Sequence, residues 1–338
     1  MWAVMRATDL LTLTPEGLYC PLGGFHIDPA RAVARAVVTH GHADHCRPGS
    51  RALLTTPQTA AIARARYGPD AFASVQTLPY GASLTVGAVT LRLVPAGHVL
   101  GSAQVVIEAG GARAVVSGDY KRQPDPTCAA FEPVACDLFV TEATFGLPVF
   151  SHPPIGDEIA RLLRSVARFP ERAHAVGTYA LGKAQRLIAG LRAAGWDGPV
   201  HLHGALVKLC DVYEGLGVAL GPRAAASVAD KAGLRGAIVL APPAALADRW
   251  ARRLPDPVIA SASGWMRIRQ RARQSGVELP LVISDHADWR ALTATIVETG
   301  AAEVWVTHGA EEALVHWCES RGVRAMPLRL AGRGEDEA

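Results

Sequence analysis

Seven side chains with metal-ligand chemistry each follow a short apolar run that the sequence predicts as a strand. Four of them stand together in the block His40-Gly41-His42-Ala43-Asp44-His45, directly after the run 36–39. The other three follow the runs 89–94, 114–116 and 304–306, and they are His98, Asp119 and His308. Histidine and aspartate suit borderline divalent metals, and seven ligands are too many for one tetrahedral ion. With one carboxylate shared they fit two ions, so we expect a binuclear metal site and hydrolytic chemistry.

The spacing inside the block predicts how its four ligands divide. We expect His40 and His42 to face one ion while Asp44 and His45 reach the other, because one tight turn cannot aim all four at a single point. A lone histidine is more often a packing or surface residue than a ligand, but that explanation does not extend to the whole block. The pair His201 and His203 has the same spacing without the Asp-His that follows, and alternation along a strand explains it.

Composition indicates a globular chain with an ample core. Of its 338 residues, 49% are apolar, and no apolar stretch approaches the length of a membrane span. The first residues lack the features of a secretory signal, so a cytoplasmic location is expected. The six cysteines form no C-x-x-C pair, which is typical of reduced, buried thiols, and Cys46 beside the ligand block is assigned to packing.

Arginine strongly outnumbers lysine among the basic residues. The net charge is only +3, but thirty of the 34 basic residues are arginine. Codon usage in a GC-rich genome and selection for phosphate binding explain this equally well at the level of sequence. The charge therefore permits a nucleic-acid partner without demonstrating one.

The order of predicted elements indicates an insertion. Up to about residue 145 the chain consists of short strands, including a hairpin of the runs 103–109 and 112–116 around Gly110-Gly111. After Pro148, helical periodicity alternates with strand-like runs, which predicts a small parallel sheet with flanking helices. From about Leu281 the short-strand pattern returns and brings His308 with it. An α/β unit thus interrupts a first domain whose ligands lie on both sides of it.

Three further motifs connect these features to a known group. The H-x-H-x-D-H block with a later His, Asp and His resembles the metallo-β-lactamase fold, an αββα sandwich with a two-metal site at one sheet edge. The segments 141–146 (Thr-Glu-Ala-Thr-Phe-Gly), 284–288 (Ser-Asp-His-Ala-Asp) and 307–309 (Thr-His-Gly) are similar, in kind and order, to motifs of the β-CASP nucleases, which include Artemis and the cross-link repair nucleases. The length and the opening 13–20 look most like the bacterial ligase-associated DNA exonucleases.

The resemblance implies a fold and domain boundaries. We expect a metallo-β-lactamase sandwich, of class α/β, with an inserted α/β β-CASP domain. The expected parts are 1–148 and 281–330 for the two pieces of the sandwich, 149–280 for the insertion and 331–338 for a flexible tail.

The resemblance also assigns roles at the site. One metal would be held by His40, His42 and His98, the other by Asp44, His45 and His308, with Asp119 bridging. Asp44 would orient the attacking water or accept its proton. His286 would protonate the leaving 3′-oxygen while Glu142 fixes its tautomer, although His286 as an eighth ligand remains open. Two divalent ions are implied, zinc first and manganese as the alternative.

Two loops of the insertion are candidates for holding the substrate. The segment 178–183 links a strand to a helix, so Lys183 and nearby amides could hold a phosphate, although an ordinary connection explains it as well. The loop of Ser261, Ser263, Gly264 and Trp265 resembles a second phosphate-binding loop, and interdomain packing of Trp265 is the alternative to base stacking. The following arginines (267, 269, 271 and 273) are typical of a solvated face.

The resemblance to the ligase-associated exonucleases implies a metal-dependent DNA exonuclease, 5′ to 3′ in direction. It would act in DNA repair on DNA with a free 5′ end and be associated functionally with a ligase and a helicase. An RNA-processing nuclease on the same scaffold is the first alternative, since Glu142, His286 and His308 match RNA-cutting relatives too. A small-molecule metallo-hydrolase, disfavoured by the size of the insertion, and a non-catalytic binding relative, disfavoured by the intact ligands, complete the alternatives.

Overall fold

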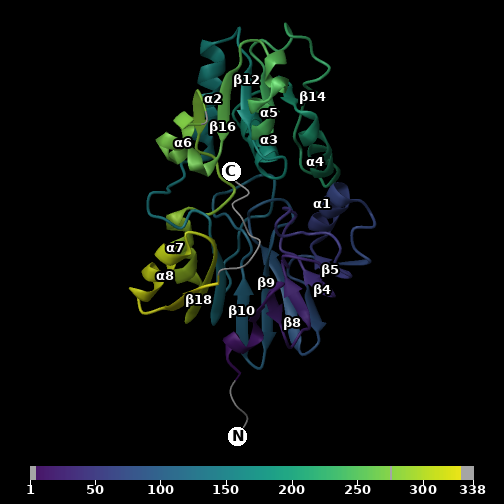
Figure 1. Ribbon diagram of the computed structural model, residues 1–338, viewed down its shortest axis with the longest axis vertical. Helices are drawn as coiled ribbons and strands as arrows, with labels where there is room; N and C mark the ends of the chain where they lie inside the picture. The colour runs from purple at the N-terminus through teal and green to yellow at the C-terminus, as the bar shows by residue number, and fades with distance from the viewer. Residues whose placement is uncertain (1–4, 275, 329–338) are drawn as a thin grey trace. The chain divides into compact units, whose positions relative to one another are not determined.

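The chain divides into two compact units (Figure 1). The computed structural model describes residues 5–274 and 276–328, so the tail expected at 331–338 and the first four residues lie outside the described part. Unit 1 contains the chain up to Phe150 and from His286 onward, and unit 2 is Ser151–Asp285. The described part contains no helix that is long and apolar enough to cross a membrane.

Unit 1 is built on two mixed sheets, which we call sheet A and sheet B. Sheet A has the strand order β1 (Thr12–Thr14), β2 (Gly17–Cys20), β3 (Phe25–Ile27), β4 (Arg35–Val37), β5 (Ala52–Thr55) and β6 (Ser74–Thr77). Sheet B has the order β19 (Arg324–Pro327), β18 (Glu303–Gly309), β11 (Leu138–Ala143), β10 (Ala112–Val116), β9 (Ala103–Ala109), β8 (Val89–Pro95) and β7 (Ser83–Val86). The predicted hairpin is confirmed, because β9 and β10 pair antiparallel around Gly110 and Gly111, both with positive φ.

Alternation along the strands of sheet B builds two cores, one on each face. Val105 and Ile107 of β9 pack with Leu18, Phe25 and other residues of sheet A. Val106, between them, joins the opposite core. Because successive side chains of a strand point to opposite faces, a strand buried on both sides reads as a continuous apolar run.

Helices cover the outer faces of both sheets. Helix α1 (Pro57–Tyr67) packs Ala63 against Ala36 and Leu53 of sheet A. On the far face of sheet B, α7 (Trp289–Thr299) and α8 (Glu311–Glu319) contribute the buried residues Leu292, Ile296, Leu314 and Cys318. The resulting order of helix, sheet, sheet and helix confirms the αββα sandwich expected from the sequence.

Helix α7 corrects one part of the sequence reading. Residues 289–299 fall where a return of short strands was expected, but they form a helix. Asp288 begins it by accepting a hydrogen bond from the N–H of Ala291, and Gly300 ends it in the left-handed conformation. The β-branched Thr and Ile residues of this segment resemble a strand in composition, whereas the buried Leu292 and Ile296 show helical spacing.

Unit 2 is a parallel sheet, sheet C, with helices between its strands. The strand order is β14 (Arg223–Ala225), β13 (Val200–Leu202), β15 (Ile238–Ala241), β12 (His174–Gly177), β16 (Val258–Ala262) and β17 (Leu279–Leu281), and every pairing is parallel. Its helical segments are α2 (Ile155–Arg168), α3 (Lys183–Ala193), α4 (Gly204–Gly215), α5 (Pro243–Ala247), η2 (Arg249–Arg253), η3 (Gly264–Arg267) and α6 (Arg269–Gln274). The inserted α/β unit is thus present. Strand β17 belongs to its sheet because it pairs with β16.

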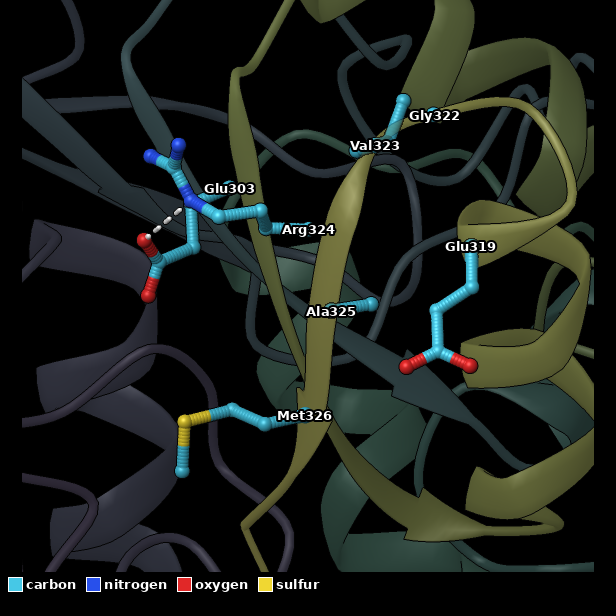
Figure 2. A pocket seen from close by; sticks show the side chains of 7 residues that line it. All are labelled: Glu303, Glu319, Gly322, Val323, Arg324, Ala325 and Met326. Atoms are coloured by element: carbon cyan, nitrogen blue, oxygen red, sulfur yellow. Dashed lines mark hydrogen bonds and ion pairs between the residues drawn. The ribbon is translucent and has the colours of Figure 1, made fainter.

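The edge of sheet B carries a hollow that is separate from the ligand residues. It has a volume of about 580 Å³ and lies along β19, where Arg324 pairs with Glu303 at 3.3 Å (Figure 2). None of the seven candidate ligands lines it, since its walls are Glu303, Glu319 and residues 322–326. This hollow is therefore not the candidate metal site.

Candidate metal centre

The loop after β4 presents four of the candidate ligands. Residues 40–46 form a tight turn in which the N–H of Cys46 donates to the carbonyl of His42 at 2.7 Å. The turn directs His40 and His42 toward His98 and Asp119, while Asp44 and His45 lie with His308. In each of these two groups, which we call group one and group two, the ligand atoms all lie within 4.8 Å of one another.

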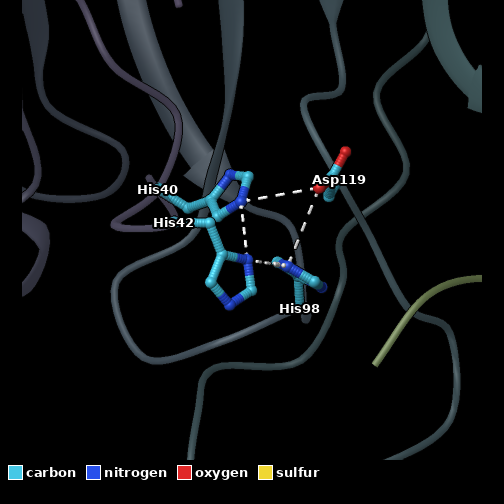
Figure 3. Close-up of side chains that lie close together, drawn as sticks. All are labelled: His40, His42, His98 and Asp119. Atoms are coloured by element: carbon cyan, nitrogen blue, oxygen red, sulfur yellow. Dashed lines mark hydrogen bonds and ion pairs between the residues drawn. The ribbon is translucent and has the colours of Figure 1, made fainter. Parts of the chain in front are cut away.

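Group one gathers three imidazole nitrogens around a small space (Figure 3). Nδ1 of His42 lies 3.1 Å from Nε2 of His40 and 3.0 Å from Nε2 of His98. A single imidazole nitrogen has one proton or one lone pair to offer, so it cannot make two good hydrogen bonds at once. Nitrogens bound to one tetrahedral zinc at its usual bond length would lie about 3.3 Å apart. The spacing therefore fits three ligands of one metal ion.

Group two is joined to group one through Asp119. Nε2 of His45 lies 3.2 Å from Oδ2 of Asp119 and 3.3 Å from Oδ2 of Asp44, which in turn is 4.0 Å from Nε2 of His308. The same Asp119 oxygen is 3.5 Å from Nε2 of His40. One carboxylate oxygen thus stands between the two groups, as a bridging ligand would.

The electrostatics of this region favour a bound cation. Burial lowers the pKa of His45, but Asp119, Asp44 and Asp28 together outweigh burial and hold that pKa well above its usual value. Burial raises the pKa of Asp119, and the surrounding histidines, His45 first, outweigh it in the opposite direction. Nε2 of His45 is fully buried yet makes no hydrogen bond to the described residues. A buried nitrogen facing two carboxylates at more than 3 Å fits a metal ligand, so the residues could hold metal ions.

Asp28 is a functional candidate that sequence reasoning missed. It follows β3, and its carboxylate accepts hydrogen bonds from the N–H of Thr39 at 2.7 Å and from the Thr39 hydroxyl at 2.6 Å. Its Oδ2 also lies 2.7 Å from Nδ1 of His45, which leaves the other ring nitrogen to face group two. Asp28 has a φ of 44°, an uncommon conformation for a residue other than glycine. Its position at yet another strand end was the available sequence signal.

His308 is placed by an irregular pairing of β11 with β18. The register shifts after Glu142, so that Ala143 pairs with Gly309. His308 has a φ of 65° and Gly309 a φ of 103°. A Cβ on Gly309 would lie 2.3 Å from the carbonyl oxygen of Ala143, so only glycine fits at this position. The glycine of the predicted His-Gly pair is thus a backbone requirement of the bulge that carries His308.

Glu142 and His286 form a buried pair beside group one. Oε2 of Glu142 lies 2.8 Å from Nδ1 of His286 and accepts a hydrogen bond from the Thr144 hydroxyl at 2.6 Å. Its Oε1 accepts from the N–H of Tyr120 at 2.7 Å. The ring centroids of His286 and His98 are 4.6 Å apart. Glu142 is therefore held in place and can fix the orientation and tautomer of His286.

The sequence is similar to proteins with nucleic-acid-related names. No family model matches the sequence. Over 331 residues, 95% of the chain, it is 31% identical to a "Probable DNA ligase" of Opitutus terrae, of which it covers 31%. It is also 28% identical to "Endoribonuclease YSH1" of Gibberella zeae, over 48% of the chain and 19% of that protein. The chain spans less than a third of the length of these relatives. These similarities support the β-CASP nuclease family.

The fold has a counterpart among solved structures. A protein of unknown function from Enterococcus faecalis V583 superimposes with a TM-score of 0.58, covering 89% of this chain and 80% of the other. The two sequences are 14% identical, so the likeness concerns the fold alone.

The substrate-binding candidates of unit 2 lie in two loops after neighbouring strands. Lys183 begins α3 and is buried, with its Nζ 4.7 Å from the ring centroid of Tyr179. Ser261 is in β16, and Ser263 begins η3 by accepting a hydrogen bond from the N–H of Trp265. Gly264 and Trp265 are the first residues of η3, so all five candidates lie within unit 2, at the start of α3 or around the junction of β16 with η3.

Trp265 differs from an open stacking platform. Its side chain is only 8% exposed, and the guanidinium of Arg271 lies over its ring with Cζ 4.0 Å from the centroid. One face of the ring is therefore occupied by a cation of the same unit.

Proposed function

We propose that this chain is a metal-dependent nuclease that hydrolyses phosphodiester bonds of DNA, as a 5′ to 3′ exonuclease acting in repair. The observation that carries the proposal is the pair of ligand groups joined at Asp119, with the Glu142–His286 pair beside them. Two divalent ions held there, zinc or manganese, would stabilise charge on the phosphate and lower the pKa of an attacking water. Two neighbouring ligand groups suit phosphodiester hydrolysis better than a site for one metal ion would.

The chain's own residues would supply orientation and proton transfer. Asp44 would use one carboxylate oxygen toward group two and keep the other to accept a proton from the attacking water. His286 would donate a proton to the leaving 3′-oxygen from Nε2, because Glu142 holds Nδ1. Thr144 and Tyr120 would keep Glu142 from rotating away.

The choice of DNA rests on the extent of the similarities. The relative named "Probable DNA ligase" aligns over 95% of the chain, whereas the endoribonucleases align over 34–48%. That name also supports a functional association with a DNA ligase, and the helicase association and cytoplasmic location stay predictions. RNA cleavage is the second candidate, and the similarity to endoribonucleases favours it.

One set of substrates tests the proposal. Purified protein with added zinc or manganese is given a linear 5′-phosphorylated strand and a closed circle, each made in DNA and in RNA. We expect degradation of the linear DNA only, and no degradation by Asp119→Ala. Equal cutting of the circle would refute the exonuclease assignment, preference for RNA would select the second candidate, and failure on all four substrates would refute nuclease activity.

A further inference from the structure

A short surface segment of unit 2 carries four exposed arginines in seven residues. Arg267 ends η3, and Arg269, Arg271 and Arg273 belong to α6 (Figure 1). All four are exposed, while Ala272 is the buried residue of α6. We call residues 267–273 the arginine segment. The guanidinium of Arg271 packs over Trp265, but packing does not explain the charges of Arg267, Arg269 and Arg273.

The carboxylates nearest in the sequence do not neutralise this segment. Between Asp256 and Glu278 the chain has no acidic residue. Both of these flanking carboxylates pair with Arg172, at 3.2 Å for Asp256 and 3.0 Å for Glu278. Other acidic residues of unit 2 are engaged in the same way, Glu158 by Arg161 and Glu214 by Arg223. Arg267, Arg269 and Arg273 thus keep an excess of positive charge.

The whole of unit 2 shows the same sign of charge. Residues 151–285 contain 18 Lys and Arg against 11 Asp and Glu, a formal charge of +7, whereas the whole chain carries +3. The remaining residues therefore carry a formal charge of −4. Codon usage alone would not place a positive net charge on one unit and a negative net charge on the other. The difference therefore favours a polyanionic partner for unit 2.

The geometry of the segment suits phosphates. Arg269 and Arg273 are four residues apart in α6, so they share one face with about 6 Å between them along the helix axis. Like charges at this spacing destabilise a helix slightly, and a bound anion relieves that cost. The guanidinium of Arg271 lies over the ring of Trp265, which limits its orientation.

We propose that the arginine segment binds the sugar-phosphate backbone of a nucleic acid strand and retains it between successive cleavages. The proposal rests on the nuclease function proposed above and adds to it a holding surface outside the metal centre. Contacts to phosphate are independent of base sequence and depend strongly on salt concentration. The surface would therefore raise affinity for long strands without selecting among them.

The test compares two triple variants with the same change of charge. The segment variant is Arg267→Gln, Arg269→Gln and Arg273→Gln, which leaves Arg271 on Trp265. The control is Arg164→Gln, Arg235→Gln and Arg252→Gln, three exposed arginines elsewhere in unit 2. Both are made with Asp119→Ala so that binding of a fluorescent 20-nucleotide DNA strand is measured without cleavage, by anisotropy between 50 and 200 mM salt. Thermal unfolding midpoints check that each variant is folded.

We expect the segment variant to bind about tenfold more weakly at 50 mM salt, with the slope of log K against log salt reduced by about 2, since each lost phosphate contact removes about 0.7. The control should change affinity by less than about threefold. Unchanged affinity and slope in the segment variant, or an equal loss in the control, would overturn the proposal. So would a polyglutamate peptide that binds the segment as tightly as DNA does, because the partner would then be an acidic protein.

A separate substrate distinguishes this outcome from failure of the nuclease function. Hydrolysis of bis(p-nitrophenyl) phosphate by the parent protein reports phosphodiester chemistry without any long strand. If the parent hydrolyses it and the segment variant binds DNA normally, only the holding surface is refuted. If the parent hydrolyses neither this diester nor any strand, the proposed nuclease function fails, while the binding comparison still decides the role of the segment.

Discussion

Replacement of Asp28 by asparagine tests whether group two is a metal site. The carboxylate is buried and takes part in three close contacts, with the N–H of Thr39, the hydroxyl of Thr39 and Nδ1 of His45. Asparagine has nearly the same shape and tolerates the positive φ of this position better than most residues. The variant therefore removes the charge that orients His45 while leaving the backbone in place.

The expected losses of metal affinity and of stability follow from the contacts that the variant removes. Loss of a partner that orients a ligating histidine lowers metal affinity by about 10- to 100-fold. That range corresponds to about 1.4–2.8 kcal/mol. For the metal-free protein we expect unfolding to become easier by about 1–3 kcal/mol, because asparagine can still accept one hydrogen bond from Thr39. Asp28→Ala loses every acceptor, and its cost should rise to about 3–5 kcal/mol.

Zinc affinity is measured by competition with a coloured chelator, and stability by urea unfolding after the metal has been removed. Asp137→Asn is the matched control, because Asp137 accepts a hydrogen bond from the N–H of Arg113 at the opposite end of β11. The control should lose some stability and keep its zinc affinity. If Asp28→Asn binds zinc within twofold of the parent, His45 is not a ligand oriented by Asp28, and the metal assignment of group two is wrong.

Three further predictions concern other parts of unit 1. Glu142→Gln should lower kcat on linear DNA, the proposed substrate, by about 10²–10³-fold with little change in KM, because the orientation of His286 is lost while substrate contacts remain. An unchanged rate in single-turnover assays would contradict this role of Glu142. Gly309→Ala should lower the free energy of unfolding in urea by about 3 kcal/mol or more, because the added Cβ meets the Ala143 carbonyl. Gly300→Ala has open space at its Cβ and should cost about 1 kcal/mol. Equal costs for the two variants would refute the steric argument. Burial raises the pKa of Cys136 to about 12 and that of Cys318 to about 11, so both thiols should resist iodoacetamide at pH 8 and react only in urea. Modification is measured by mass spectrometry, and rapid modification of the native protein would show that these sites open.

Short-range patterns were the predictable part of this molecule. The ligand block, the Gly-Gly hairpin and the strand–helix alternation of unit 2 are encoded within a few residues, so they can be recognised without knowledge of the fold. The αββα layering followed from resemblance, and the structure confirms it. Helix α7 was missed because its threonines and isoleucine have strand-like composition, although Asp288 and Gly300 stand at its ends.

Partnerships across the sequence could not be foreseen in the same way. Asp28 looks like an ordinary turn residue until β3 and β4 place it against His45. Trp265 stays a candidate for stacking, but its contact with the guanidinium of Arg271, six residues later, was not foreseen. In both cases the tertiary fold, not the local pattern, decides what the side chain contacts.

The pairing of β11 with β18 has a consequence for the order in which the protein is made. These neighbours in sheet B are separated by residues 144–302, and all of unit 2 is synthesised between them. Group one is complete in the nascent chain once Asp119 has emerged, whereas group two waits for His308. Because the two strands are far apart in the sequence, their pairing is also expected to be a slow step of folding. We therefore expect the growing chain to be able to bind a first ion early and to complete the proposed catalytic site only when β18 has paired with β11.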